Sequence, residues 1–141
     1  MSDRRMDEMV RRQNPATLPM DAIVQDACRV MRERQIGAML ITSDDGLLAG
    51  IFTGRDAVGR VVAEGRDPAA AKLADVMTRS PETIGPRDHA SDALQMMFFG
   101  GYRHLPIVDE NGKIIGIVSR GDFTGRELAR RDDETGFWEI I

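Results

Sequence analysis

The segment Gly50–Asp56 reads GIFTGRD, and the segment Gly116–Asp122 reads GIVSRGD. Both consist of a glycine, two apolar residues, Thr or Ser, two variable residues and Asp. A shift of 66 positions carries the first segment onto the second and aligns the flanking residues without a gap. Identical pairs elsewhere under this shift include Val10/Val76, Pro15/Pro81, Thr17/Thr83, Asp26/Asp92, Ala27/Ala93, Met31/Met97, Ile41/Ile107 and Gly46/Gly112. We therefore infer that the chain contains two copies of one unit.

Each copy is predicted to fold as strand, helix, strand, strand, helix. The first strands are short, around residues 17–18 and 83–84. Apolar residues at helical spacing follow in each copy, namely Ile23, Ala27, Val30 and Met31, and Ala90, Leu94, Met97 and Phe98. The last helices are expected from about residue 55 to 64 and from about residue 122 to 131. A further short helix is expected between the copies, opened by Asp67-Pro68.

Two hairpins are predicted between these helices. Residues 39–42 pair with 47–53 across Asp45-Gly46, and residues 105–108 pair with 113–119 across Asn111-Gly112. Asp-Gly and Asn-Gly are typical of the tight primed turns that join antiparallel strands. Pro106 is expected near the start of an edge strand, where its missing N–H costs nothing.

A sheet of three strands with two helices is too small to bury both of its faces. We therefore expect an α+β fold in which the two units pack sheet against sheet. The expected boundaries are 1–66 for the first unit with an N-terminal helix, 67–131 for the second unit with a linker helix, and 132–141 for a C-terminal tail. No effector domain is expected outside the pair.

Length and composition exclude several classes of protein. A chain of 141 residues is too short for a (β/α)₈ barrel, which needs roughly 250. It has no apolar run of the roughly 20 residues that a membrane span needs, and its charged start lacks a signal sequence, so a cytoplasmic protein is expected. A net charge of −4 argues against nucleic acid as a partner.

Catalytic and metal chemistry are not expected either. The single cysteine, Cys28, has no partner for an internal disulfide, and with His89 and His104 it supplies too few ligands for a structural zinc site. No arrangement of a nucleophile, a base and an orienting acid is evident. We therefore expect neither an enzyme nor a metal site.

The repeated turn has two interpretations. A Thr or Ser followed three residues later by an acid forms a capping box at a helix start, whatever the function. The same geometry also suits a ligand, because the hydroxyl can reach a phosphate and the Asp can accept hydrogen bonds from ribose hydroxyls. Arg55, Arg120 and Arg103 are candidates to bind phosphate, and His104 is a candidate to contact it. Capping and binding can coexist.

The ordered set of motifs resembles the tandem CBS (cystathionine-β-synthase) domain pair, also called a Bateman module, over roughly residues 6–131. The resemblance rests on residues 14–18 and 80–84, on residues 103–109 and on the two repeated turns. It implies two β-α-β-β-α units in pseudo-twofold contact that dimerise through helices. It also implies clefts between the units that bind AMP, ADP, ATP, S-adenosylmethionine or NADH, and a role in regulating a target enzyme or transporter.

The resemblance assigns site residues position by position. Asp56 and Asp122 would hold ribose, Thr53 and Ser119 would contact ribose or phosphate, and Arg55 or Arg120 would face phosphate. The adenine would lie against residues of the strands, which are Thr17, Leu18, Met39 and Leu40 in one cleft and Thr83, Ile84, Leu105 and Pro106 in the other. The first copy has Gly37-Ala38 where the second has Arg103-His104. The second cleft is therefore expected to bind phosphorylated nucleotides better.

The function expected from the sequence is a non-catalytic sensor of adenosine nucleotides, with the nucleotide as ligand and no cofactor. The alternative is a scaffold for dimerisation or docking in which the clefts are vestigial. A homodimer is expected because Met31, Met97 and Phe98 form an apolar stripe larger than a small sheet can cover.

Overall fold

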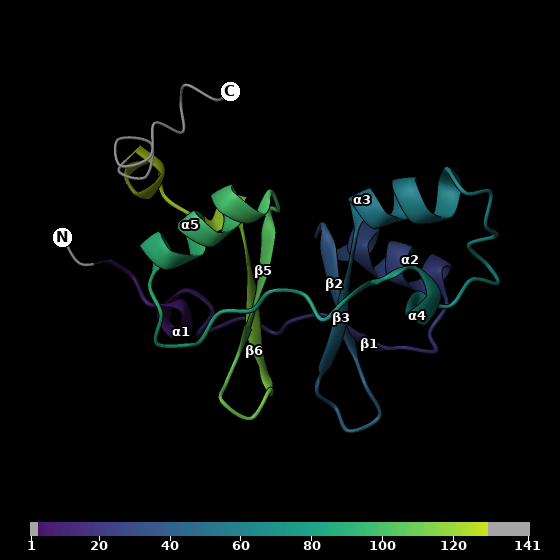
Figure 1. Cartoon of the computed structure of the whole chain (residues 1–141), viewed down its shortest axis with the longest axis horizontal. Coiled ribbons are helices and arrows are strands. Elements are labelled where there is room, and N and C mark those ends of the chain that lie inside the picture. Colours follow the sequence, from purple (N-terminus) through teal and green to yellow (C-terminus); the bar gives the residue numbers. More distant parts are fainter. Residues whose placement is uncertain (1–2, 130–141) are drawn as a thin grey trace. The chain divides into compact units, whose positions relative to one another are not determined.

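The computed structural model describes residues 3–129, which form two compact units (Figure 1). The first-repeat unit is Asn14–Pro81. The second-repeat unit consists of residues 82–129 together with residues 3–13, which come from the other end of the chain. Both units contain helices and strands, so the expected α+β class is confirmed.

The first-repeat unit is built on a four-stranded sheet. Its elements are β1 (Thr17–Pro19), α2 (Val24–Arg34), β2 (Ala38–Thr42), β3 (Leu48–Thr53), α3 (Gly54–Asp56), the π-helix η1 (Ala57–Val62), α4 (Leu73–Val76) and β4 (Thr78–Arg79). The strand order is β1-β2-β3-β4, with β1 parallel to β2 and the other pairs antiparallel. The predicted strand, helix, strand, strand, helix order is confirmed, whereas β4 was not foreseen.

The second-repeat unit has a smaller sheet. Its elements are α1 (Met6–Met9), α5 (Ala90–Gly100), β5 (His104–Val108), β6 (Ile114–Ser119) and the 3₁₀ turn η2 (Arg120–Asp122). The strand expected at residues 83–84 is reduced to one parallel bridge between Ile84 and Ile107. In the first repeat, the Leu40 N–H donates to the Ala16 carbonyl at 3.2 Å. The matching position of the second repeat is Pro106, which has no N–H to donate, so this ladder is shorter.

The last helix of the second repeat begins later than predicted. After η2 the backbone is extended at Phe123, with φ −90° and ψ 143°, and helical hydrogen bonding resumes at residues 125–129. The Phe123 side chain is buried in the core of its unit. Arg131 and the expected tail at 132–141 lie outside the described residues.

The two hairpin turns differ from the predicted primed type. A type I′ turn needs positive φ at both central residues, but only Gly46 and Gly112 have it, and Asp45 and Asn111 do not. The Gly46 N–H donates to the Ser43 carbonyl at 2.9 Å, and the Gly112 N–H donates to the Asp109 carbonyl at 3.0 Å. Each hairpin therefore has a three-residue loop in which glycine forms the bulge.

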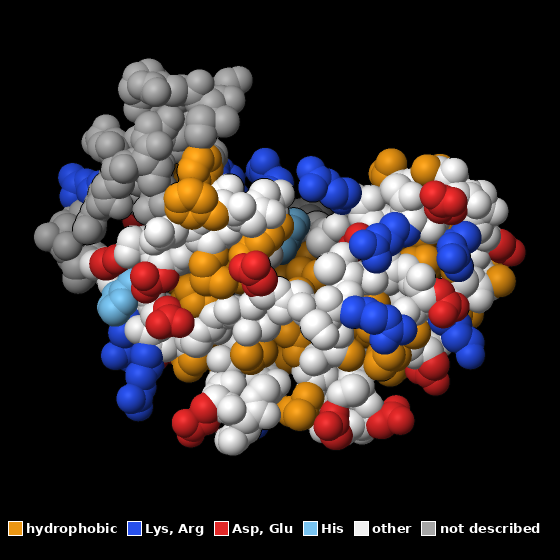
Figure 2. All heavy atoms as spheres, viewed as in Figure 1, with side chains coloured by type: hydrophobic (Ala, Val, Ile, Leu, Met, Phe, Trp, Pro, Cys, Tyr) orange, Lys and Arg blue, Asp and Glu red, His pale blue; other side chains and the backbone are white. Residues whose placement is uncertain are grey.

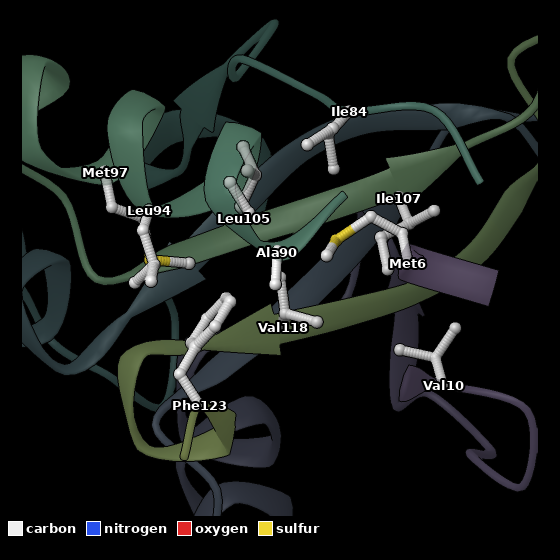
Figure 3. Close-up of a cluster of buried hydrophobic side chains, with 11 residues drawn as sticks. Met6, Val10, Ile84, Ala90, Leu94, Met97, Leu105, Ile107, Val118 and Phe123 are labelled. Atoms are coloured by element: carbon white, nitrogen blue, oxygen red, sulfur yellow. The ribbon is translucent and has the colours of Figure 1, made fainter. Parts of the chain in front are cut away.

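Each short helix that precedes a repeat packs on the other repeat. Met6 and Val10 belong to the buried core of the second-repeat unit, which also contains Leu94 and Val118 (Figure 3). Leu73, Val76 and Met77 lie in the core of the first-repeat unit, with Val24 and Phe52 at its centre. The expected boundaries at 1–66 and 67–131 grouped each short helix with the repeat that follows it in sequence. The structure groups it by the core that its apolar side chains complete.

Two repeated glycines lie where these segments approach the sheets. A Cβ atom on Gly50 would lie 2.6 Å from the Met77 sulfur and 2.8 Å from the Thr78 carbonyl oxygen. A Cβ atom on Gly116 would lie 2.7 Å from the Gln13 side-chain oxygen and 2.8 Å from the Val10 Cβ. Such distances are too short for any side chain, so the first glycine of each repeated turn is needed for packing.

We expect Gly50→Ala and Gly116→Ala each to lower the free energy of unfolding by about 1–3 kcal/mol, since an added methyl group overpacks the contact. Urea denaturation of the two variants measures this. Gly59→Ala is the matched control, because Gly59 is helical and a Cβ there would meet nothing within 4 Å. It should leave stability unchanged or raise it by about 0.4–1 kcal/mol. Equal stability of all three variants would contradict the packing role.

Candidate functional site

The two repeated turns form the same local structure. The Asp56 carboxylate accepts a hydrogen bond from the Thr53 N–H at 3.0 Å, and the Asp122 carboxylate accepts one from the Ser119 N–H at 2.7 Å. In each turn the hydroxyl residue and the acid make the reciprocal bonds of a capping box. The capping interpretation is therefore confirmed for both repeats. The surroundings of the two carboxylates differ.

The Asp56 carboxylate is committed to contacts within its own unit. It is 7% exposed. Its Oδ2 atom accepts from the N–H and the hydroxyl of Thr53, the latter at 3.2 Å. Its Oδ1 atom accepts from the Thr78 hydroxyl at 3.3 Å and lies 3.5 Å from the Arg60 Nε atom. Both carboxylate oxygens of the first repeat therefore already have donors.

The Asp122 carboxylate is exposed, and only one of its two oxygens accepts hydrogen bonds from the described residues. Its Oδ2 atom accepts from the Ser119 N–H and from the Ser119 hydroxyl at 3.3 Å. Among the residues that the structure describes, no group donates to its Oδ1 atom. This oxygen is therefore free to accept a hydrogen bond from a ligand hydroxyl.

The backbone places three basic residues at or beside the Ser119–Asp122 turn, namely Arg103, His104 and Arg120. His104 is the register partner of Ser119 across the β5–β6 ladder, and the Arg120 N–H donates to the Arg103 carbonyl at 3.0 Å. Burial lowers the pKa of His104 below its usual value, and the neighbouring Arg103 guanidinium lowers this pKa further. The imidazole is therefore neutral at pH 7, and a nearby phosphate would favour its protonation. In the first repeat the corresponding backbone bond joins Gly54 to Gly37 at 3.2 Å, and only Arg55 supplies a cation within the turn.

Several residues that the resemblance assigned to adenine lie in the cores. Met39, Ile84 and Leu105 are at most 4% exposed and belong to the two core clusters. Their side chains pack against helices, which leaves their backbone groups as the parts able to meet a ligand. Leu40 and Pro106 alternate with core residues along their strands and so point to the opposite face of the sheet. Thr17 is exposed, and Leu18 and Thr83 are half-buried.

The second-repeat unit also has a hollow of about 890 Å³ away from this turn. Thr83 and Ile84 line it, together with Val108 at the far end of β5 and the acidic side chains Asp88, Asp92, Asp109 and Glu110. Figure 2 shows acidic side chains around apolar atoms on this unit. The His104 and Val108 ends of β5 are about 13 Å apart at strand spacing. Four carboxylates against one cation, Arg87, disfavour a nucleotide phosphate there, so we do not assign the hollow to a nucleotide.

Sequence reasoning missed three residues that contact the two aspartates of the repeated turns. Arg60 follows Asp56 by four positions in a helical segment, and this spacing could have indicated the pair. Thr78 lies 22 positions from Asp56, and no local pattern connects them. Arg4 donates to the Asp122 carbonyl from 118 positions away. Contacts of this length depend on the exchange of the short helices between the repeats.

Helix length and the grouping of metal-ligating side chains were the last two features of interest in residues 3–129. None of the helices in this range is long and apolar enough to cross a membrane. The same residues contain no cluster of three or more His, Cys, Asp or Glu side chains arranged to hold a metal ion.

Two repeats that share a helix, a hairpin and a capped turn after the hairpin define a tandem pair of small α+β domains. The CBS domain family matches the chain twice, over residues 7–63 and 73–128. The chain belongs to this family, and the resemblance found in the sequence is confirmed. The matched ranges cover most of both described units.

Individual relatives agree with this membership. A CBS domain-containing protein of Arabidopsis thaliana is 43% identical over 102 residues, which are 72% of this chain and 18% of the relative. The chain thus spans about a fifth of the length of the plant relatives that it matches. A CBS-domain protein of Agrobacterium tumefaciens has a solved structure with 26% identity and a TM-score of 0.75, covering 90% of this chain and 98% of that one. A Pyrobaculum aerophilum CBS domain protein, solved in complex with AMP, has 22% identity and a TM-score of 0.82, covering 92% and 99%.

Substitution of the two acids should separate their structural roles. We expect Asp56→Ala to lower the free energy of unfolding by about 2–3 kcal/mol, because buried donors lose their acceptor. Asp122→Ala should cost about 1 kcal/mol or less, the usual value of an exposed cap. Thermal denaturation of both variants tests this, and equal losses would show that the two carboxylates are structurally equivalent.

Proposed function

We propose that this chain is a non-catalytic regulatory module that binds an adenosine nucleotide at the Ser119–Asp122 turn of its second repeat. The target of the regulation would be an enzyme or a transporter. The AMP complex of the Pyrobaculum aerophilum protein makes AMP the first ligand to test. The proposal depends on the exposed Asp122 carboxylate, whose Oδ1 atom has no donor among the described residues.

A nucleotide would meet complementary groups at this turn. Its ribose hydroxyls would donate to Asp122, and the Ser119 hydroxyl lies 3.3 Å from the same carboxylate. Its phosphate would meet Arg103, His104 and Arg120, which the β5–β6 ladder and the turn place at neighbouring backbone positions. Guanidinium groups suit phosphate because they donate in a planar fork. The adenine would lie against the backbone of residues 105–106, since the Leu105 side chain is buried in the core of its unit.

The first repeat is less suited than the second to bind a nucleotide. Asp56 is already saturated by Thr53, Thr78 and Arg60, so a ribose hydroxyl would have to displace one of these donors. We therefore propose one nucleotide per chain, at the second of the two clefts expected from the sequence, which was also expected to bind phosphorylated nucleotides better. The alternative function, a docking scaffold, applies to the first repeat better than to the second.

Calorimetric titration with AMP tests the proposal. We expect a stoichiometry of one per chain, and Asp122→Asn should weaken AMP about ten- to a hundredfold, since a hydrogen bond to a charged group contributes about 1.5–3 kcal/mol. Asp56→Asn is the matched control and should leave the AMP affinity unchanged. Arg103→Ala should reduce both the preference for AMP over adenosine and the salt dependence of binding, whereas Arg55→Ala should change neither.

Two results would contradict this assignment. Unchanged AMP affinity in Asp122→Asn would mean that the acid is only a helix cap. Failure of AMP, ADP, ATP, adenosine, S-adenosylmethionine and NADH to bind the unmodified protein would favour the scaffold instead.

The surface evidence for a homodimer differs from the sequence expectation. Met97 is buried in the core of its unit, Met31 is partly buried against the core of its own unit, and Phe98 is half-buried. The strongly exposed apolar residues are instead Phe99, at 71%, and Val58 and Val62 on η1. Their positions on helices support self-association through helical surfaces.

We expect light scattering to show a dimer of the 15.6 kDa chain at micromolar concentration. Phe99→Ser or Val62→Ser should shift the population toward monomer, because each removes exposed apolar area from the contact. Gln95→Ser, which changes an exposed polar residue of α5, is the control. A monomeric unmodified protein would contradict the homodimer.

A further inference from the structure

Arg4 links the segment before the first repeat to the turn of the second repeat. Its guanidinium donates through Nε and Nη2 to the two oxygens of Glu127, at 3.0 and 2.6 Å. Nη2 also donates to the backbone carbonyl of Asp122 at 3.1 Å. One side chain therefore holds two consecutive turns, because Glu127 in turn caps the next helix by accepting from the Thr124 N–H at 2.8 Å.

The break at Phe123 explains why Asp122 needs this donor. In the first repeat, helical structure continues from Asp56 into η1, so successive carbonyls can find partners within the helix. In the second repeat, the extended backbone at Phe123 ends η2 after one turn. A carbonyl at such an end takes its donor from outside the helix, and here Arg4 is that donor.

The segment that carries Arg4 is itself fixed to the same unit. The Ala90 N–H donates to the Arg4 carbonyl at 2.7 Å, and the Met6 N–H donates to the Asp88 carbonyl at 2.8 Å. Asp3 accepts from the N–H and the hydroxyl of Ser91. Hydrogen bonding to Arg4 also lowers the pKa of Glu127, as expected for a well-formed pair. Hydrogen bonds on either side of Arg4 thus fix the position from which its guanidinium reaches the turn.

We propose that Arg4 is a positioning residue that orders the Ser119–Asp122 turn for nucleotide binding, and that docking of residues 3–13 is coupled to occupancy of this site. The coupling is reciprocal, because a ligand that binds only the ordered turn must also stabilise the contacts that order it. The inference rests on the proposed function. It adds a route by which nucleotide binding at one repeat reaches the segment that leads into the other.

Hydrogen exchange of the nucleotide-free protein tests the positioning role directly. Arg4→Ala should speed amide exchange across residues 119–127, whereas Arg5→Ala should not, because Arg5 pairs with Asp7 and Glu8 of its own segment. Ile107→Val is a second control, since it destabilises the core of the same unit near the other end of β5. Unchanged exchange in Arg4→Ala, or equal changes in Arg4→Ala and Ile107→Val, would overturn the proposal.

AMP titration tests the coupling. Arg4→Ala should weaken AMP about tenfold, while Arg5→Ala and Ile107→Val should leave the affinity unchanged. AMP should slow exchange of the Met6 and Asp7 amides in the unmodified protein, but not in Arg4→Ala. Equal AMP affinity with and without Arg4 would overturn the coupling even if the turn exchanges faster. Absence of AMP binding to the unmodified protein would instead overturn the proposed function, and the nucleotide-free exchange experiment would still decide whether Arg4 orders the turn.

Discussion

Both units depend on one kind of contact, in which the segment after a short helix packs closely on the second strand of a hairpin. The segment after α4 packs on β3, and the segment after α1 packs on β6. At Gly50 and Gly116 the missing side chain lets Met77 and Val10 reach the sheet, and apolar residues of α4 and α1 then complete the two cores. A small sheet with few helices buries little apolar surface by itself, so the apolar residues of α1 and α4 contribute to the stability of the unit on which they pack. The chain therefore cannot be divided at one point into two independent repeats.

This exchange also determines how the two carboxylates are used. The residues that follow α4 bring Thr78 to Asp56, and the residues that precede α1 bring Arg4 to the backbone of Asp122. In the first repeat Thr78 donates to the Asp56 carboxylate. In the second repeat Arg4 donates to the Asp122 backbone carbonyl, so the Asp122 carboxylate remains accessible to a ligand. Duplication of a motif thus gives one buried structural acid and one exposed acid suited to a ligand.

Packing of the second repeat adds to this difference. Pro106 on β5 limits pairing with residues 83–84 to a single bridge. Burial of Phe123 interrupts the helix after the turn. The interruption leaves the Asp122 backbone carbonyl without a partner in a continuing helix, and Arg4 donates to it instead. Irregular backbone in the second repeat is therefore linked to the site that we propose for the nucleotide.

Local patterns were sufficient to predict the duplicated unit, its order of strands and helices, its CBS family and the capping boxes at Thr53 and Ser119. These features depend on residues a few positions apart, and their spacing is visible in the chain. The partners of Asp56 and Asp122, the reassigned boundaries and the break at Phe123 could not be predicted in this way. They arise because apolar side chains of Met6, Leu73 and Phe123 are buried wherever a core has room for them, and that choice depends on contacts between distant parts of the sequence.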